Sequence, residues 1–226
     1  EVTDYIRVLD RSGYFETVTL SEDDLKRNDM YRANAQRAKA QSRFADYHDY
    51  LLSLEMTAEI GDFSPLYLQR ITQLTNKSNQ FNLTTKRYTA EQMEAVYNSD
   101  EYIRLYGKLY DKFGDNGVVA VTIGKTGSED KGRLDIELWL MSCRVLKRDM
   151  ELAMLDSLVA QAKKRGIREI YGHYYPTAKN KMVAGLYESF GFEKISQDEE
   201  GNTAWRLLVE GYEDKNTVIK VKEEHY

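Results

Sequence analysis

The residues best suited to chemistry lie where an apolar stretch passes into a basic loop, in residues 140–151. Arg144, Lys147 and Arg148 stand there, directly before an amphipathic segment. Free N–H groups at a helix N-terminus and the dipole of that helix favour a bound phosphate, and nearby cations add to the attraction. The segment therefore predicts an anion site, and the alternative is a solvated turn that carries three surface cations.

Cys143, the single cysteine of the chain, precedes Arg144 in the same loop. A cation and a helix N-terminus favour the thiolate, which is the nucleophilic form of cysteine. Such a thiolate can accept an acyl group as a thioester and pass it to a carrier thiol. The alternative is a buried structural cysteine, the commoner fate of this residue type. His173 lies one predicted strand away and is a candidate base, unless its side chain faces the other side of the sheet.

The segment 179–192 resembles motif B of the GNAT acetyltransferases. Asn180 stands early in it, Tyr187 follows seven residues later, and Gly191 and Phe192 close it. This resemblance implies the GNAT fold, in which two central parallel strands splay apart and receive the thioester arm of CoA or of a carrier's phosphopantetheine. It also implies that Tyr187 protonates the leaving thiolate, and core packing is the alternative role of this tyrosine.

The same resemblance places the pyrophosphate of the cofactor at the loop after Cys143. In GNAT proteins this loop reads Arg/Gln-x-x-Gly-x-Gly/Ala, because glycine lets the backbone approach the phosphates. Here Arg144 matches, but Lys147 and Asp149 stand at the glycine positions, and Asp149 brings a carboxylate to the anion. A carrier-bound phosphopantetheine or a degenerate site is therefore expected in preference to acetyl-CoA. The predicted cofactor-binding residues are Arg144, Val145, Leu146, Lys147, Arg148 and Asn180.

The hydrophobic pattern around these segments predicts a mixed α/β sheet. Strands are expected at residues 102–110, 117–124, 134–141, 167–175, 192–195 and 204–209. Helices are expected from Ser64 and Pro65, from the capping box at Thr89, over 150–165 and over 178–190. With the resemblance, the expected fold class is GNAT-like: a mixed, mostly antiparallel sheet flanked by helices and preceded by a helical linker arm. The polar tail after Gly211 is expected to be mobile or an edge strand.

The chain is expected to divide at a polar helical segment. Residues 21–60 begin close to a capping box and contain few apolar residues, which is typical of a helix or helix pair that links domains. Residues 1–20 are expected to be the tail of a preceding HAD-type domain, and residues 61–226 the acyltransferase domain. The first residue is Glu1 rather than Met, so we expect the natural chain to start further upstream.

Several blocks resemble the FkbH-like family, over essentially the whole chain. They are residues 13–16, 20–23, 73–88, 142–146 and 175–180. Members of that family join an N-terminal HAD-type phosphatase domain of subfamily IIIC to a GNAT-like domain. The resemblance implies that a glyceryl unit from bisphosphoglycerate is loaded onto an acyl carrier protein with loss of phosphate. The Asp-x-Asp motif and its Mg²⁺ belong to the HAD domain, and this chain contains no Asp-x-Asp.

The polar block of residues 76–85 is a candidate acyl pocket. Its amide and hydroxyl groups suit a hydroxylated acyl group, while Phe81 and Leu83 are expected to anchor the block in the core. The alternative is a loop that satisfies its own backbone and packs on the domain. The predicted substrate-binding residues are Asn79, Gln80, Asn82, Thr84, Thr177 and Lys179.

Composition argues against several other classes of protein. A net charge of −5 does not suit a nucleic-acid binder, which needs a basic surface. No apolar run reaches the roughly 20 residues that span a bilayer, and there is no secretory signal peptide. A single cysteine fits a reducing cytoplasm, and His48, His173 and His225 lack the spacing of zinc ligands.

Together these features predict an acyltransferase that loads a small hydroxyacyl unit onto the thiol of an acyl carrier protein. The donor is expected to be a small acyl phosphate or acyl thioester. Two alternatives remain open from the sequence. One is a degenerate GNAT-fold module that binds the carrier without catalysis, and the other is an ordinary N-acetyltransferase that uses acetyl-CoA.

Overall fold

The computed structural model describes residues 22–222. Residues 1–45 and 46–226 form two separate compact units. The prediction for residues 1–20 lies outside the described residues. The second unit begins before residue 61, the predicted start of the acyltransferase domain, because a helix and a strand that precede this point belong to it.

The polar segment that was predicted to form one helix or two contains two helices. Helix α2 (Glu22–Gln41) belongs to the first unit, and α3 (Tyr47–Ser53) opens the second. Asp46 starts α3, because its side chain accepts a hydrogen bond from the Asp49 backbone N–H. No helix in residues 22–222 is both long and apolar enough to cross a bilayer.

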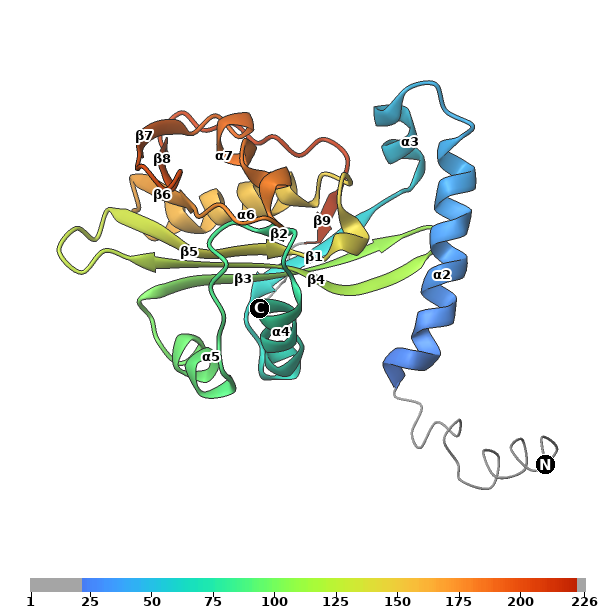
Figure 1. The fold of residues 1–226 in the computed structure, drawn as a ribbon, viewed down its shortest axis with the longest axis horizontal. Coiled ribbons are helices and arrows are strands. Elements are labelled where there is room, and N and C mark those ends of the chain that lie inside the picture. Colours follow the sequence, from blue (N-terminus) through green and yellow to red (C-terminus); the bar gives the residue numbers. More distant parts are fainter. Residues whose placement is uncertain (1–21, 223–226) are drawn as a thin grey trace, which may run out of the picture. The chain divides into compact units, whose positions relative to one another are not determined.

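In the described part of the second unit, one mixed sheet of nine strands forms the centre (Figure 1). Its order is β7-β8-β6-β5-β4-β3-β1-β9, and β2 pairs with β5 off this path. Only β5 with β6 and β1 with β9 run parallel. The strands are β1 (Thr57–Asp62), β2 (Phe81–Asn82), β3 (Tyr102–Asp111), β4 (Gly114–Thr126), β5 (Arg133–Met141), β6 (Glu169–Tyr174), β7 (Glu193–Gln197), β8 (Thr203–Leu208) and β9 (Lys220–Lys222).

Helices cover both faces of this sheet, with α6 on one face and α4 and α5 on the other (Figure 1). Ser64 caps α4 through its side chain, and Thr89 and Gln92 form the predicted capping box of α5. The predicted fold class, a mixed and mostly antiparallel sheet flanked by helices, is confirmed. The helices are α4 (Pro65–Lys77), α5 (Ala90–Tyr97), α6 (Met150–Lys164) and α7 (Leu186–Ser189).

The predicted helix over residues 178–190 is wrong in its extent. The segment forms a short 3-10 turn, η2 (Lys181–Val183), and then the single turn of α7. Asn180 uses its side chain to bond the preceding loop, and Gly185 between the two turns lowers helix propensity. The sequence also missed β1, while β9 beside it confirms the edge strand that was one of two options for the tail.

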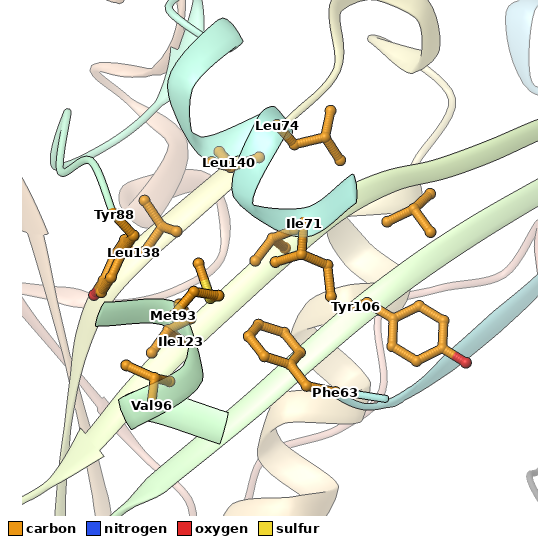
Figure 2. Close-up of a cluster of buried hydrophobic side chains, with 12 residues drawn as sticks. Phe63, Ile71, Leu74, Tyr88, Met93, Val96, Tyr106, Ile123, Leu138 and Leu140 are labelled. Atoms are coloured by element: carbon orange, nitrogen blue, oxygen red, sulfur yellow. The ribbon is translucent and has the colours of Figure 1, made fainter. Parts of the chain in front are cut away.

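The apolar core on the α4 and α5 face is continuous across the central strands. Ile71 and Leu74 of α4 and Met93 and Val96 of α5 pack against strand residues such as Ile123 (Figure 2). The opposite face of the sheet is covered by the buried side of α6. The buried residues of that helix are Met150, Ala153, Met154, Leu155, Leu158, Val159 and Ala162.

Strand β5 changes its register halfway along, and this opens the sheet. Ile123 pairs with Leu138, but the next residue, Gly124, pairs with Ile136, so that Glu137 is an extra bulged residue. On the other edge of β5, the parallel pairing with β6 ends at Asp135. Beyond this point the two parallel strands separate, as the GNAT resemblance implies.

We predict that Gly172→Ala destabilises the fold, because β6 lies against an aromatic ring at this residue. A Cβ at Gly172 would lie 2.3 Å from Cε1 of Tyr187, too close for any real contact. We expect a loss of about 2 kcal/mol in the free energy of unfolding, measured by denaturant titration. Gly185→Ala is the control, because a Cβ there meets nothing within 4 Å and φ is −97°. Equal stability of the two variants would contradict this packing.

Candidate active site

The opening between β5 and β6 is filled by a short segment of the chain itself, Phe81–Thr84. Phe81 and Asn82 form β2 and pair antiparallel with Met141 and Leu140 of β5 (Figure 1). The Leu83 backbone N–H donates to the Trp139 carbonyl at 3.1 Å. The Leu83 carbonyl accepts from the Tyr175 N–H at 2.9 Å. We call Phe81–Thr84 the seam segment, because it joins the two separated strands.

The seam segment is deeply buried. Leu83 and Asn82 are 0% exposed, Phe81 is 4% exposed and Thr84 is 7% exposed. Burial of the Phe81 and Leu83 side chains contributes roughly 3–6 kcal/mol together. The prediction that these two residues anchor the polar block is confirmed by their burial.

The side chains of Asn82 and Thr84 are buried and bonded within the chain, and their role in acyl binding stays a prediction. The Asn82 side chain accepts from the Thr85 N–H at 2.9 Å and donates to the Ser78 carbonyl. The Thr84 hydroxyl donates to the Glu137 carbonyl at 2.7 Å, next to the separation of the strands. Both side chains are used inside the protein, because a buried segment must satisfy its own polar groups.

Asn180 ties the seam segment to the end of β6. Its side-chain amide donates to the Asn82 carbonyl at 3.0 Å and to the Tyr175 carbonyl at 2.9 Å. Its side-chain oxygen accepts from the Thr177 N–H at 2.7 Å and from the Thr177 hydroxyl at 3.0 Å. Asn180 is 0% exposed and positions the two loops, and its cofactor-binding role stays a prediction.

The loop after β5 keeps the backbone shape of a glycine-rich loop without glycine. Lys147 has φ of +63° and Asp149 has φ of +59°, at the two positions where the GNAT pattern has glycine. A left-handed residue other than glycine costs roughly 1–2 kcal/mol, so the surroundings must hold the loop. The Tyr47 hydroxyl of α3 contributes by donating to the Lys147 carbonyl at 2.6 Å.

Arg148 points into the protein and supports the loop from beneath. Its guanidinium pairs with the Asp111 carboxylate at 3.1 Å and donates to the Arg144 carbonyl at 2.9 Å and to Asn116. It is buried, and its guanidinium is paired within the chain. Val145 is also buried, and its N–H donates to the Ser142 carbonyl. A cofactor contact of either residue stays a prediction.

Cys143 and Arg144 lie on the surface at the end of β5. They begin a 3-10 turn, η1 (Cys143–Val145), which Ser142 caps through its side chain. Both residues are exposed, so the predicted alternative of a buried structural cysteine does not apply. Lys147 is exposed as well, while Leu146 is only partly exposed.

Two carboxylates lie at the start of α6, where the resemblance expects phosphate. Burial raises the pKa of Asp149, against a smaller opposite effect of His48. The pKa of Glu151 is raised to about 7, mainly by burial. A hydrogen bond from its own backbone N–H lowers the pKa, and the nearby charge of Asp149 raises it further. One oxygen of Glu151 is buried without a hydrogen-bond partner in the described part of the chain. Where they are ionised, these groups disfavour another anion at this helix end.

His173 is paired with Asp135 and lies far from Cys143. Its Nε2 is 3.3 Å from the Asp135 carboxylate, which also binds Arg133 at 2.6 Å. Burial raises the pKa of Asp135, but hydrogen bonds from His173 and Arg133 outweigh it and bring the pKa to about 2. Five strand residues lie between Asp135 and Met141, a separation of about 20 Å, which argues against His173 as a base for Cys143.

Tyr187 lies in an aromatic cluster beneath the opening. Its ring contacts Trp139, Phe192 and Trp205, and it is 1% exposed. Burial raises the pKa of its hydroxyl, which the His173 backbone offsets only in part. No hydrogen bond of good geometry reaches this hydroxyl within residues 22–222. The Tyr187 ring packs in the core, which is one of the two roles predicted for this residue.

The other predicted substrate-binding residues remain exposed. Asn79, Gln80 and Lys179 are on the surface, and Thr177 is exposed while its hydroxyl binds Asn180. The antiparallel direction of β2 and β5 carries Gln80 toward the side of Cys143. These residues therefore gather at the outer end of the opening, and no local sequence signal showed that Asn82 and Thr84 would face inward instead.

Comparison with known proteins decides the fold. No family model and no curated protein matches the chain. It is similar to the ribosomal-protein-S18-alanine N-acetyltransferase from Escherichia coli, with 14% identity and a TM-score of 0.51 over 71% of this chain and 99% of that one. It is also similar to the GNAT domain of S. lividans PAT, with 16% identity and a TM-score of 0.52 over 67% and 90%. This chain has the GNAT acetyltransferase fold.

A third similar structure is YncA from Salmonella typhimurium with its cofactor acetyl-CoA. It shares 14% identity and a TM-score of 0.51, over 70% of this chain and 96% of that one. At identities this low, the similarity shows the GNAT fold alone. The reaction has to be argued from the residues of the site. Here the site differs from the expected pattern in its filled opening and in the carboxylates beside its loop.

We predict that Arg148→Met lowers the free energy of unfolding by about 3 kcal/mol. The substitution removes the guanidinium from the side of Asp111, whose side chain is 0% exposed. Arg144→Met is the matched control, because Arg144 is exposed, and a change within about 0.5 kcal/mol is expected. Denaturant titration of both variants checks this, and equal losses would contradict the anchoring role of Arg148.

Glu151 should make the fold less stable as pH rises from about 4.5 to about 7. The folded state holds a proton on Glu151 that the unfolded state releases near its ordinary pKa of 4.5, so stability falls through this window and stays lower above it. Glu151→Gln should remove this loss, which is about 3 kcal/mol. Thermal unfolding between pH 4 and pH 8 measures it. The control is Glu94→Gln, on the exposed side of α5, and parallel curves for all three proteins would refute the effect.

Proposed function

We propose that this chain is an acyltransferase that holds its acyl group on Cys143 and passes it to the thiol of a carrier. The observation that carries the proposal is the position of Cys143. It is an exposed nucleophile beside exposed Arg144, at the end of a strand whose inner edge the seam segment already occupies. A reaction at this opening is therefore best placed at its outer end.

The surroundings of Cys143 suit a small polar acyl group. Gln80 directly precedes Phe81, which pairs with Met141 two positions before Cys143. Asn79 lies next to it and its side chain accepts from Arg87. Thr177 and Lys179 lie in the loop after β6, which Asn180 fastens to the seam segment. Amide, hydroxyl and ammonium groups can bind the hydroxyls or a phosphate of such a substrate. These exposed residues, together with Arg144, are the proposed substrate-binding set.

The reaction proceeds by two displacements at one carbonyl carbon. The Cys143 thiolate attacks the carbonyl of an acyl phosphate, the new C–S bond forms, and phosphate leaves with the electron pair of the broken C–O bond. The thiolate of the carrier then attacks the thioester, forms its own C–S bond and releases the Cys143 thiolate. The positive charge of Arg144, the neighbouring residue, stabilises the departing phosphate. The proton of the carrier thiol is released to solvent.

The resemblance to the FkbH-like family refines this proposal. It supports a glyceryl-type acyl group, an acyl carrier protein as partner, and a HAD-type domain upstream that contains the phosphatase and its Mg²⁺. In this arrangement residues 1–20 are the tail of that domain, residues 21–45 belong to the linker, and the transferase domain is the second compact unit, which begins at Asp46. The block 73–88, which contributes most to the resemblance, contains the seam segment and the adjoining Asn79 and Gln80.

An ordinary acetyl-CoA-dependent N-acetyltransferase is the second candidate. The fold favours it, since similar structures include an N-acetyltransferase and a protein with bound acetyl-CoA. In that reaction Tyr187 would protonate the thiolate that leaves. The candidate requires the thioester arm to enter between β5 and β6, where Leu83 and Thr84 lie.

We predict that bisphosphoglycerate leaves an acyl adduct on Cys143. Intact-mass spectrometry of the whole chain detects it without ambiguity among thiols, because Cys143 is the only cysteine. Cys143→Ser should lower transfer to a phosphopantetheinylated carrier at least about 100-fold. His173→Gln should leave transfer unchanged, because His173 pairs with Asp135 away from Cys143. Full transfer by Cys143→Ser would refute the covalent route, and carrier binding without any transfer would favour a pure binding module.

A further inference from the structure

The separation of β5 and β6 creates the kind of crevice in which α/β proteins bind ligands. Such crevices lie beyond the carboxyl ends of parallel strands, where neighbouring strands part. Here the parallel pairing stops at Asp135 and Tyr171, and both strands continue beyond it. In the GNAT fold, the thioester arm of the cofactor enters at this separation.

Backbone groups on both sides of this crevice are paired with the seam segment. On the β5 side, the carbonyls of Glu137 and Trp139 accept from Thr84 and Leu83. On the β6 side, the Tyr175 N–H donates to Leu83. An arm that bound along either edge would have to break these hydrogen bonds and expose buried apolar side chains.

We infer that the seam segment, Phe81–Thr84, is a built-in strand that permanently replaces the thioester arm between β5 and β6. The chain accordingly binds no pantetheine arm in the crevice and meets its thiol partner outside the sheet, at Cys143. The second statement rests on the proposed function. The first rests on the seam segment alone.

The loop after β5 supports the same conclusion independently. An arm in the crevice belongs to a cofactor whose diphosphate would lie at the start of α6. There the Arg148 guanidinium turns inward to Asp111, and Asp149 and Glu151 place two acidic side chains at the helix start. The residues present are ill suited to a diphosphate, because Arg148 is engaged elsewhere and a carboxylate repels phosphate wherever it is ionised.

A removable gate is the competing interpretation of the seam segment, and the contacts favour a fixed strand. Its four residues are all buried, and Asn180 fastens the Asn82 carbonyl from the opposite side of the opening. Asn180 is itself held by Thr177 and Tyr175. Departure of the segment would disrupt the β5 edge and the loop after β6 together.

Hydrogen exchange of the full chain, with and without saturating acetyl-CoA or pantetheine, tests the inference. The Leu83 and Tyr175 amides report the two rims, and the amide of Val121 in β4 is the internal reference for a core strand. We expect both amides to exchange at least about 1,000-fold more slowly than an unstructured chain, with rates that neither probe changes more than twofold. Acceleration of either amide by more than tenfold on addition of a probe would overturn the built-in strand.

A second measurement detects acetyl-CoA binding that does not change the hydrogen-exchange rates. Calorimetric titration of the wild type and of Leu83→Ala with acetyl-CoA should show no binding at millimolar concentration for the wild type. The inference would be overturned if the wild type bound acetyl-CoA tightly and Leu83→Ala changed that affinity more than tenfold. Such a result would place the arm in the crevice. Leu66→Ala, a change at an exposed leucine of α4, is the control. Failure of the Cys143 adduct would refute the proposed function and leave both of these results unaffected.

Discussion

The parting of β5 and β6 imposes the constraint on which the rest of this structure depends. The bulge at Glu137 shifts the register of β5, and the parallel contact with β6 ends after Asp135. Strand edges beyond that point would leave buried N–H and C=O groups without partners, which costs about 1–3 kcal/mol for each group. The seam segment supplies the missing partners, and Asn180 holds it in place. The α4–α5 connection and the β6–α7 connection must therefore meet at this opening.

The same requirement explains why the loop after β5 tolerates residues other than glycine. Lys147 and Asp149 adopt left-handed backbone conformations that most side chains avoid. The loop is fixed from within by Arg148 and from α3 by Tyr47. An inward guanidinium satisfies a buried carboxylate and leaves Cys143 exposed. The loop thus has left-handed residues at the two positions where the GNAT pattern has glycine.

Local features of the fold could be predicted because neighbouring residues produce them. The Ser64 and Thr89 caps depend on donors within a few positions, and the strand of residues 134–141 on alternation along one segment. The helix over residues 178–190 was overextended, because the side chain of Asn180 serves distant backbone groups instead of continuing a helix. The hydrophobic periodicity of a segment does not show that a side chain in it will bond distant backbone groups.

The sequence by itself determined the fold class, many of the helices and strands of the second unit, and the anchoring role of Phe81 and Leu83. Only the tertiary structure decided which of the predicted polar site residues face outward. Asn82 meets Asn180 across 98 positions of sequence, and Tyr47 meets Lys147 across 100. Which donor satisfies which acceptor depends on where the strands part, and that is settled by packing of the whole sheet. The same packing filled the expected thioester slot with the chain's own backbone.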